Sequence, residues 1–188
     1  FIKSEFVSFS GDDDYLVPNS IKKGITLLKS NSSFTAVNGD ALCAITLKNR
    51  KKVGYFAPYP LNNRYEDKAS ERILELMKDY TLPLFSIHRT HAFKELLSFI
   101  PDASQFKDLC PVWAIADELL PASISVGLGK VTRIDNLLLV RTIHSDQYHM
   151  PSITENIVDF DIAINYYKKC MVALFQRDIL SQKKSLYI

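Results

Sequence analysis

The sequence of 188 residues predicts a single domain of the α/β class, with α+β as the alternative, and three observations support this interpretation. Apolar runs such as residues 6–9 and 84–88 alternate with stretches of helical periodicity, an order typical of α/β proteins. Hydrophobic residues make up 47% of the chain and charged residues 23%, which is a globular composition. The length suffices for one well-buried core and leaves little room for a second domain.

Charge, hydropathy and cysteine content narrow the class of protein. The formal net charge of +2 gives no basic excess that would favour a nucleic-acid partner. No apolar run approaches the roughly eighteen residues that a transmembrane segment needs. The widely spaced Cys43, Cys110 and Cys170 form no CxxC pair, so we expect reduced thiols, a cytoplasmic location and no zinc site. Because Phe1 leads almost directly into an apolar strand, we expect this chain to be a portion of a longer polypeptide.

The first elements expected are a strand and a helix. Residues 6–9 form a short apolar run that predicts a buried strand. Pro18 is suited to the first turn of a helix, and Ile21, Ile25 and Leu28 then fall on one face. A polar segment follows the last of these residues, so we expect the helix to end there.

A hairpin and a third strand are expected next. The apolar runs 34–37 and 41–47 flank Asn38-Gly39-Asp40, and Asn-Gly between two such runs is typical of a tight hairpin. After a charged turn, residues 53–56 predict a further short strand. Residues 58–64 are expected to form a loop.

The middle of the chain predicts a helix over 67–80, with Asp67 as its N-cap. Its inner face is expected to comprise Ile73, Leu76 and Met77. Residues 84–88 predict a strand, and 90–99 a short helix that follows it directly.

The C-terminal third predicts a closing pair of strands and a long helix. Residues 130–134 and 137–141 are expected to pair around a turn at Asp135-Asn136. The last helix is expected from about residue 161 to 180. Its apolar stripe comprises Ile164, Tyr167, Met171, Leu174 and Phe175, which indicates core or domain contact.

Three successive carboxylates, Asp12, Asp13 and Asp14, follow the first predicted strand. They repel one another, and a purely structural turn needs only one of them. A hard divalent cation, which takes oxygen ligands, is the natural way to hold such a cluster. The end of a strand is also where open α/β sheets bind ligands. The alternative is a solvated, aspartate-rich turn ahead of a helix.

A second acidic site, Asp117 and Glu118, lies shortly before Pro121. Since proline is poorly tolerated inside a helix, we expect a helix to start near Glu118, run to Val126 and stop at Gly127. Both carboxylates then lie at a helix N-terminus, where the dipole favours negative charge. The alternative is that one acid caps the helix and the other is solvated.

The order of these motifs resembles the family 2 glycosyltransferases. An aspartate cluster with Pro18 shortly after it is followed much later by an acidic pair, a glycine and the strand 140–144. The resemblance covers roughly residues 6–144. It implies a Rossmann-like, A-type nucleotide-sugar fold. Since only five residues precede Phe6, it also implies that most of the N-terminal nucleoside-binding half is absent from this chain.

The resemblance implies that Asp12, Asp13 and Asp14 bind Mn²⁺ or Mg²⁺, which neutralises the diphosphate of a nucleotide-sugar donor. The Asp-x-Asp spacing favours Asp12 and Asp14 as ligands, whereas the distance to Pro18 favours Asp13 and Asp14. On the second register Gly11 stands where an aspartate is expected. Donor-binding roles fall on Asp12, Asp13 and Arg141, and His144 is a further candidate metal ligand. The alternatives are a surface ion pair for Arg141 and no special role for His144.

Catalysis, by the same resemblance, would use Asp117 as the general base that takes the proton of an acceptor hydroxyl. Glu118 is the competing candidate for this role. The acceptor would be a carbohydrate or another hydroxyl compound, and one direct displacement would invert the anomeric centre.

Two other classes of function stay open. One is an aspartate-nucleophile phosphatase or phosphotransferase, although Leu16 stands where such a motif would continue with threonine or valine. The other is a non-catalytic carbohydrate-binding or interaction domain that retains an enzyme scaffold.

Overall fold

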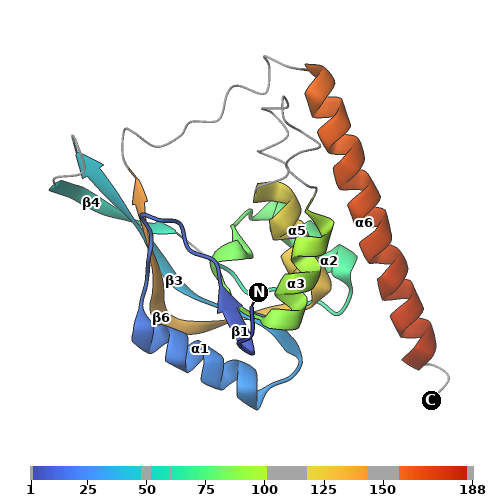
Figure 1. Ribbon diagram of the computed structural model, residues 1–188, viewed down its shortest axis with the longest axis horizontal. Helices are drawn as coiled ribbons and strands as arrows, with labels where there is room; N and C mark the ends of the chain where they lie inside the picture. The colour runs from blue at the N-terminus through green and yellow to red at the C-terminus, as the bar shows by residue number, and fades with distance from the viewer. Residues whose placement is uncertain (1, 48–51, 60, 101–117, 144–156, 186–188) are drawn as a thin grey trace.

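A computed structural model describes residues 2–47, 52–59, 61–100, 118–143 and 157–185 (Figure 1). The elements in chain order are β1 (Phe6–Ser8), β2 (Tyr15–Leu16), α1 (Pro18–Ser30), β3 (Phe34–Leu47), β4 (Lys52–Tyr59), α2 (Ala69–Lys78), the 3₁₀ helix η1 (Pro83–Phe85), β5 (Ile87–Arg89), α3 (Thr90–Phe99), α5 (Leu120–Leu128), β6 (Lys130–Ile143) and α6 (Ile157–Ser185). The structure therefore combines α-helices with a mixed β-sheet, as the sequence predicted. The described boundaries of α3 are those expected from the sequence.

The strands form one mixed, curled sheet with the order β1-β5-β3-β6-β2, and β4 pairs with β3 off this path. The central pair, β3 and β6, is parallel, whereas the other described pairs are antiparallel. The two long strands therefore organise the sheet, and the short β1 and β2 lie at its two ends.

The hairpin expected at Asn38-Gly39-Asp40 is wrong, because β3 continues through these residues as one strand. Gly39 is needed for a close approach. A Cβ built on it would lie 2.6 Å from both the Asn136 carbonyl oxygen and the Leu138 Cβ of β6. The register of the β3–β6 pair shifts at this point, so the glycine marks an irregularity of the ladder.

The turn expected at Asp135-Asn136 is also wrong, because here too the strand is continuous. β6 runs unbroken through these residues and pairs in parallel with β3, so the two segments do not pair with each other. The polar residues that favour a turn lie beside Gly39 at the irregular part of the ladder. The two incorrect turn predictions therefore fall on neighbouring residues of β3 and β6.

The two faces of the sheet carry separate apolar cores. On one face α1 packs through Leu28 against Val37, Ile87 and Leu138. On the other face the larger core joins the sheet to α2, α3, α5 and α6, and it includes Leu76, Leu96, Leu120, Ile124, Val131, Leu139 and Leu174. Neighbouring strand residues such as Leu138 and Leu139 face opposite cores, as the pleat requires. Figure 1 shows α6 on the outer side of the helical layer.

The helix α5 extends past its expected end, so Gly127 does not stop it. A Cβ on Gly127 would lie 3.1 Å from Leu174 Cδ1 of α6 and 3.3 Å from Ile73 Cδ1 of α2. The absence of a side chain therefore allows three helices to pack closely. The helix ends at Gly129, where a Cβ would lie 2.2 Å from Thr35 Cγ2.

Arginine side chains donate hydrogen bonds to carbonyl groups at the ends of three helices. Arg72 is buried and donates to the carbonyl oxygens of Val126 and Gly127 in the last turn of α5. Arg64 donates to the Asp79 carbonyl at the end of α2. Arg89 donates to the Leu28 and Asn31 carbonyls at the end of α1. Positive charge at these ends also suits the helix dipole.

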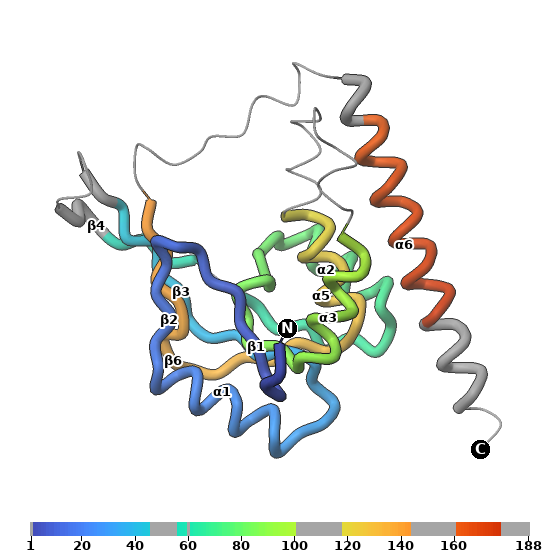
Figure 2. The backbone as a smooth tube through the Cα atoms, viewed as in Figure 1, coloured from blue at the N-terminus to red at the C-terminus, as the bar shows by residue number. Residues whose placement is uncertain are grey.

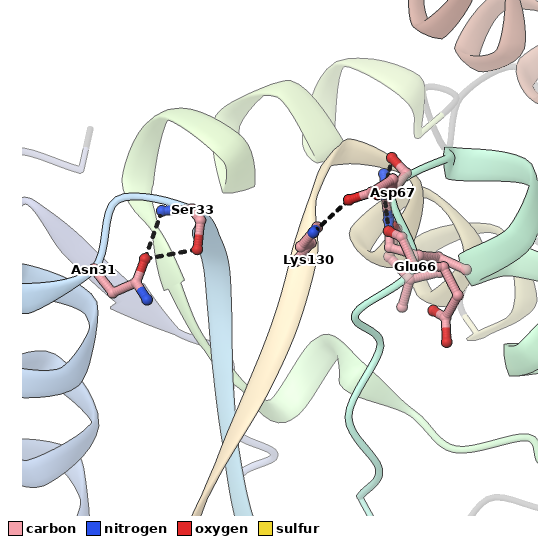
Figure 3. A network of polar contacts seen from close by, with 7 residues as sticks. Asn31, Ser33, Glu66, Asp67 and Lys130 are labelled. Atoms are coloured by element: carbon pink, nitrogen blue, oxygen red, sulfur yellow. Dashed lines mark hydrogen bonds and ion pairs between the residues drawn. The ribbon is translucent and has the colours of Figure 1, made fainter.

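Asp67 does not cap α2, which begins at Ala69 with Lys68 at the N-cap and no capping side chain. Asp67 instead accepts a hydrogen bond from Lys130, the first residue of β6, at 2.6 Å (Figure 3). This ion pair joins the segment before α2 to the sheet and lowers the pKa of Asp67.

Several other boundaries differ from the expected ones. Ile73 and Leu76 are buried as expected, but Met77 is exposed and the inner face of α2 contains Arg72 instead. The strand expected at 84–88 divides into η1 and β5. The loop expected from residue 58 begins later, because β4 continues to Tyr59. In the part of the chain that the structure describes, no helix is long and apolar enough to span a membrane.

Candidate functional site

The aspartate cluster forms a turn that lies on the end of β6. Figure 2 shows the chain running from β1 to β2 along this end of the sheet. The amide of Asp14 donates to the Gly11 carbonyl across the turn, at 3.4 Å. The Thr142 hydroxyl of β6 donates to the Asp13 carbonyl at 2.7 Å. The backbone of the turn is therefore fixed by the strand beside it.

Asp14 is held by two groups of β6. Its Oδ1 accepts a hydrogen bond from the Thr142 amide at 3.2 Å, and its Oδ2 lies 3.8 Å from Arg141 Nε. Only 5% of the Asp14 side chain is exposed. Burial raises the pKa of Asp14, while the charge of Arg141 and the Thr142 hydrogen bond act in the opposite direction. Asp14 is thus an anchor of the turn.

The register of the sheet explains this pairing. In the antiparallel β2–β6 ladder Tyr15 pairs with Val140 and Leu16 with Leu139. One further step of the same register brings Asp14 opposite Arg141. The ion pair therefore follows from the alignment of two strands far apart in sequence.

Gly11 occupies a position where a side chain would press on Asp14. A Cβ built there would lie 3.0 Å from Asp14 Oδ2 and 3.4 Å from Asp13 Oδ1. The glycine therefore gives the Asp14 carboxylate room to turn back against β6.

The guanidinium of Arg141 also contacts two aromatic rings. Its Cζ lies 4.7 Å from the ring centroid of Phe85 in η1 and 5.4 Å from that of Tyr59 at the end of β4. Arg141 pairs with Cys43 in β3, and Tyr59 pairs with Ala41, so the two side chains flank β3 on the same face. Cation–π contacts of this kind hold a guanidinium in place.

Phe85 links this cluster to β1. Phe85 is buried, and its ring centroid lies 5.7 Å from that of Phe9, which is 44% exposed. Phe9 follows β1 and immediately precedes the aspartate turn. The aromatic contacts therefore run from the solvent beside the turn to the guanidinium of Arg141.

Glu118, directly before α5, acts electrostatically on the same cluster. Burial is the main cause that raises the pKa of Tyr59, and the negative charge of Glu118 adds to it. Burial and Glu118 together also raise the pKa of Tyr80. The charge of Glu118 thus acts on Tyr59, which contacts Arg141.

The donor set at the turn is one of hard oxygen atoms, suited to Mn²⁺ or Mg²⁺. Asp12 is exposed and Asp13 is half-buried, whereas both oxygens of Asp14 face β6 groups. No set of three His, Cys, Asp or Glu side chains converges as a metal cluster within the described residues. Since Mg²⁺ often takes one or two carboxylates together with substrate phosphates, Asp12 and Asp13 still fit such an ion.

Two predicted site residues, Asp117 and His144, lie outside the described residues. Asp12, Asp13, Asp14 and Arg141 lie together at the end of β6, which the order of motifs alone did not establish. Sequence reasoning missed Tyr59, Phe85 and Tyr80. Their only signal was aromatic character in or beside predicted helices and strands, and many core positions share it.

No protein-family model matches the chain, and no curated protein matches it.

Proposed function

We propose that this chain carries the metal-binding and acceptor-side part of a glycosyltransferase with a Rossmann-like, A-type nucleotide-sugar fold. The reaction would transfer a sugar from a nucleotide-sugar to an acceptor hydroxyl with inversion. The proposal is supported mainly by the cluster around Arg141, on which two separate carboxylates, Asp14 and Glu118, act. Asp14 pairs with Arg141, Arg141 contacts Tyr59, and the charge of Glu118 acts on Tyr59.

The residues at the turn would have distinct roles. Asp12 and Asp13 would hold Mn²⁺ or Mg²⁺, which neutralises negative charge on the departing diphosphate. Asp14 would fix the shape of the turn through Thr142, and Arg141 would supply a second positive charge for the phosphates. A cation and a guanidinium on the same side of the leaving group suit the charge that develops there.

The base would come from the acidic pair before α5. Asp117 is the first candidate and Glu118 the second. A carboxylate in this role accepts the proton of the acceptor hydroxyl as it attacks the anomeric carbon. We also propose a cytoplasmic location, because the described cysteines, Cys43 and Cys170, are free thiols.

The direct test measures release of nucleoside diphosphate from a panel of nucleotide-sugars by the full-length gene product, with Mn²⁺ and with a chelator. We expect activity only with the metal, and we expect the double variant Asp12→Asn/Asp13→Asn to lose it without loss of folding. Asp135→Asn is the matched control, since this exposed carboxylate lies on β6 away from the turn. Full activity in the double variant, or in the chelator, would contradict the proposal.

A further inference from the structure

The contacts of Arg141 point to a role for a residue that the sequence did not single out. Arg141 lies beside one carboxylate at 3.8 Å, and its Cζ lies within 5.4 Å of two ring centroids. A single contact at 3.8 Å is too long for a strong bidentate pair, so the carboxylate alone does not fix the guanidinium plane. The rings supply the missing constraint.

We propose that Tyr59 is a positioning residue that holds the Arg141 guanidinium against Phe85, as a rigid anion-binding group for the diphosphate of the substrate. This inference rests on the proposed function and adds a residue to it. Tyr59 lies at the end of β4 and reaches Arg141 across β3. Phe85 is buried and lies on a separate element, so the two rings hold the guanidinium from β4 and η1.

The charge environment supports this role. The positive charge of Arg141 partly offsets the effect of burial on the pKa of Tyr59. Asp14 lies beside Arg141, and the negative charge of Glu118 acts on Tyr59. An anion that enters near Arg141 would meet a guanidinium already oriented, and less side-chain entropy would be lost on binding.

The test uses inorganic pyrophosphate with Mn²⁺ as the probe, and calorimetry as the measurement. We expect Tyr59→Leu to weaken pyrophosphate binding by about tenfold, the range of a cation–π contact. Tyr59→Phe keeps the ring and should stay within about twofold of the wild type. Arg141→Lys should bind as weakly as Tyr59→Leu, because lysine lacks the planar group that packs on a ring. Tyr65→Phe, on an exposed tyrosine bonded to Thr132, is the matched control.

A second readout needs no ligand. Aromatic rings shift the NMR signal of a nearby Arg Nε–H proton, so this signal of Arg141 should move in Tyr59→Leu and stay close to its wild-type position in Tyr59→Phe. If Tyr59→Leu binds pyrophosphate normally while Arg141→Gln does not, the role of Tyr59 is overturned and the proposed function stands. If the wild type fails to bind pyrophosphate, the proposed function is contradicted. An unmoved Arg141 signal in Tyr59→Leu overturns the positioning role in either case.

Discussion

The carboxylate of Asp14 lies beside the guanidinium of Arg141 at the end of β6, with Oδ2 3.8 Å from Nε. The pair joins two segments more than a hundred residues apart, because the β2–β6 register brings them opposite each other. The same guanidinium contacts Tyr59 and Phe85. This side-chain cluster is the structural link between the aspartate turn and the rest of the candidate site.

The first prediction concerns the titration of Asp14. Burial raises the pKa of Asp14 above the ordinary 3.8, and the positive charge of Arg141 limits this rise. Arg141→Gln should therefore raise the pKa of Asp14 further, which carboxyl-carbon NMR measures directly. Arg133→Gln is the control, since Arg133 lies on the same strand and pairs with Asp40 instead. A lower Asp14 pKa in Arg141→Gln would contradict the ion pair.

The second prediction concerns the role of Gly39. Gly39→Ala should lower the free energy of unfolding by about 2 kcal/mol, because the added methyl group has no space beside Asn136 and Leu138. Denaturant unfolding measures this change. The neighbouring Asp40→Ala, which removes only a surface ion pair, should cost under about 1 kcal/mol. Equal stability of Gly39→Ala and the wild type would show that the strands are not so close.

The third prediction concerns Arg72. Its side chain donates to the carbonyl oxygens of Val126, Gly127, Glu66 and Asp67. Arg72→Met should lower the free energy of unfolding by about 3 kcal/mol, because buried carbonyls lose their donors. Lys78→Met, at an exposed pair with Glu75, should change stability by less than about 1 kcal/mol. Equal losses in the two variants would contradict a structural role for the buried arginine.

The fourth prediction concerns pH. Burial lowers the pKa of His88 to about 4 from an ordinary 6.5. The folded protein therefore keeps the ring neutral where the unfolded chain takes up a proton. This contribution to the free energy of unfolding is complete above pH 6.5 and falls as the pH drops toward 4, by about 3 kcal/mol at most. The raised pKa of Asp14 has the opposite effect, because just above pH 3.8 it makes the free energy of unfolding increase as the pH falls.

Comparison of variants separates the His88 effect from that of Asp14. His88→Gln should show a weaker loss of stability between pH 6.5 and 4 than the wild type. The same slope in His88→Gln and the wild type would mean that His88 is protonated in the folded protein.

The sequence predicted those elements whose signal is local. Helix α1 begins at Pro18, and α3 has the boundaries that its periodicity indicated. The two turn predictions were wrong because Asn-Gly and Asp-Asn occur both where the chain reverses and where two strands approach closely. Only the neighbouring strand distinguishes these cases, as the space at Gly39 shows.

In the candidate site too, only the residues with a local sequence signal were predicted. Asp12, Asp13 and Asp14 were recognisable because adjacent carboxylates are unusual in a structural turn. The anchoring role of Asp14 was not predictable, since it depends on a strand far along the chain. Tyr59 and Phe85 lie near Arg141 only because β3, β4, β6 and η1 meet there.

The most direct test of the central claim is Mn²⁺ binding followed by paramagnetic broadening of NMR signals, in the presence of a nucleotide-sugar. The account predicts that the signals of Gly11, Asp12 and Asp13 broaden first, and that Asp12→Asn/Asp13→Asn abolishes the effect. Signals near Asp135, an exposed carboxylate elsewhere on β6, should stay sharp. Broadening that spares the aspartate turn, or that persists unchanged in the double variant, would contradict a metal-dependent transfer site here.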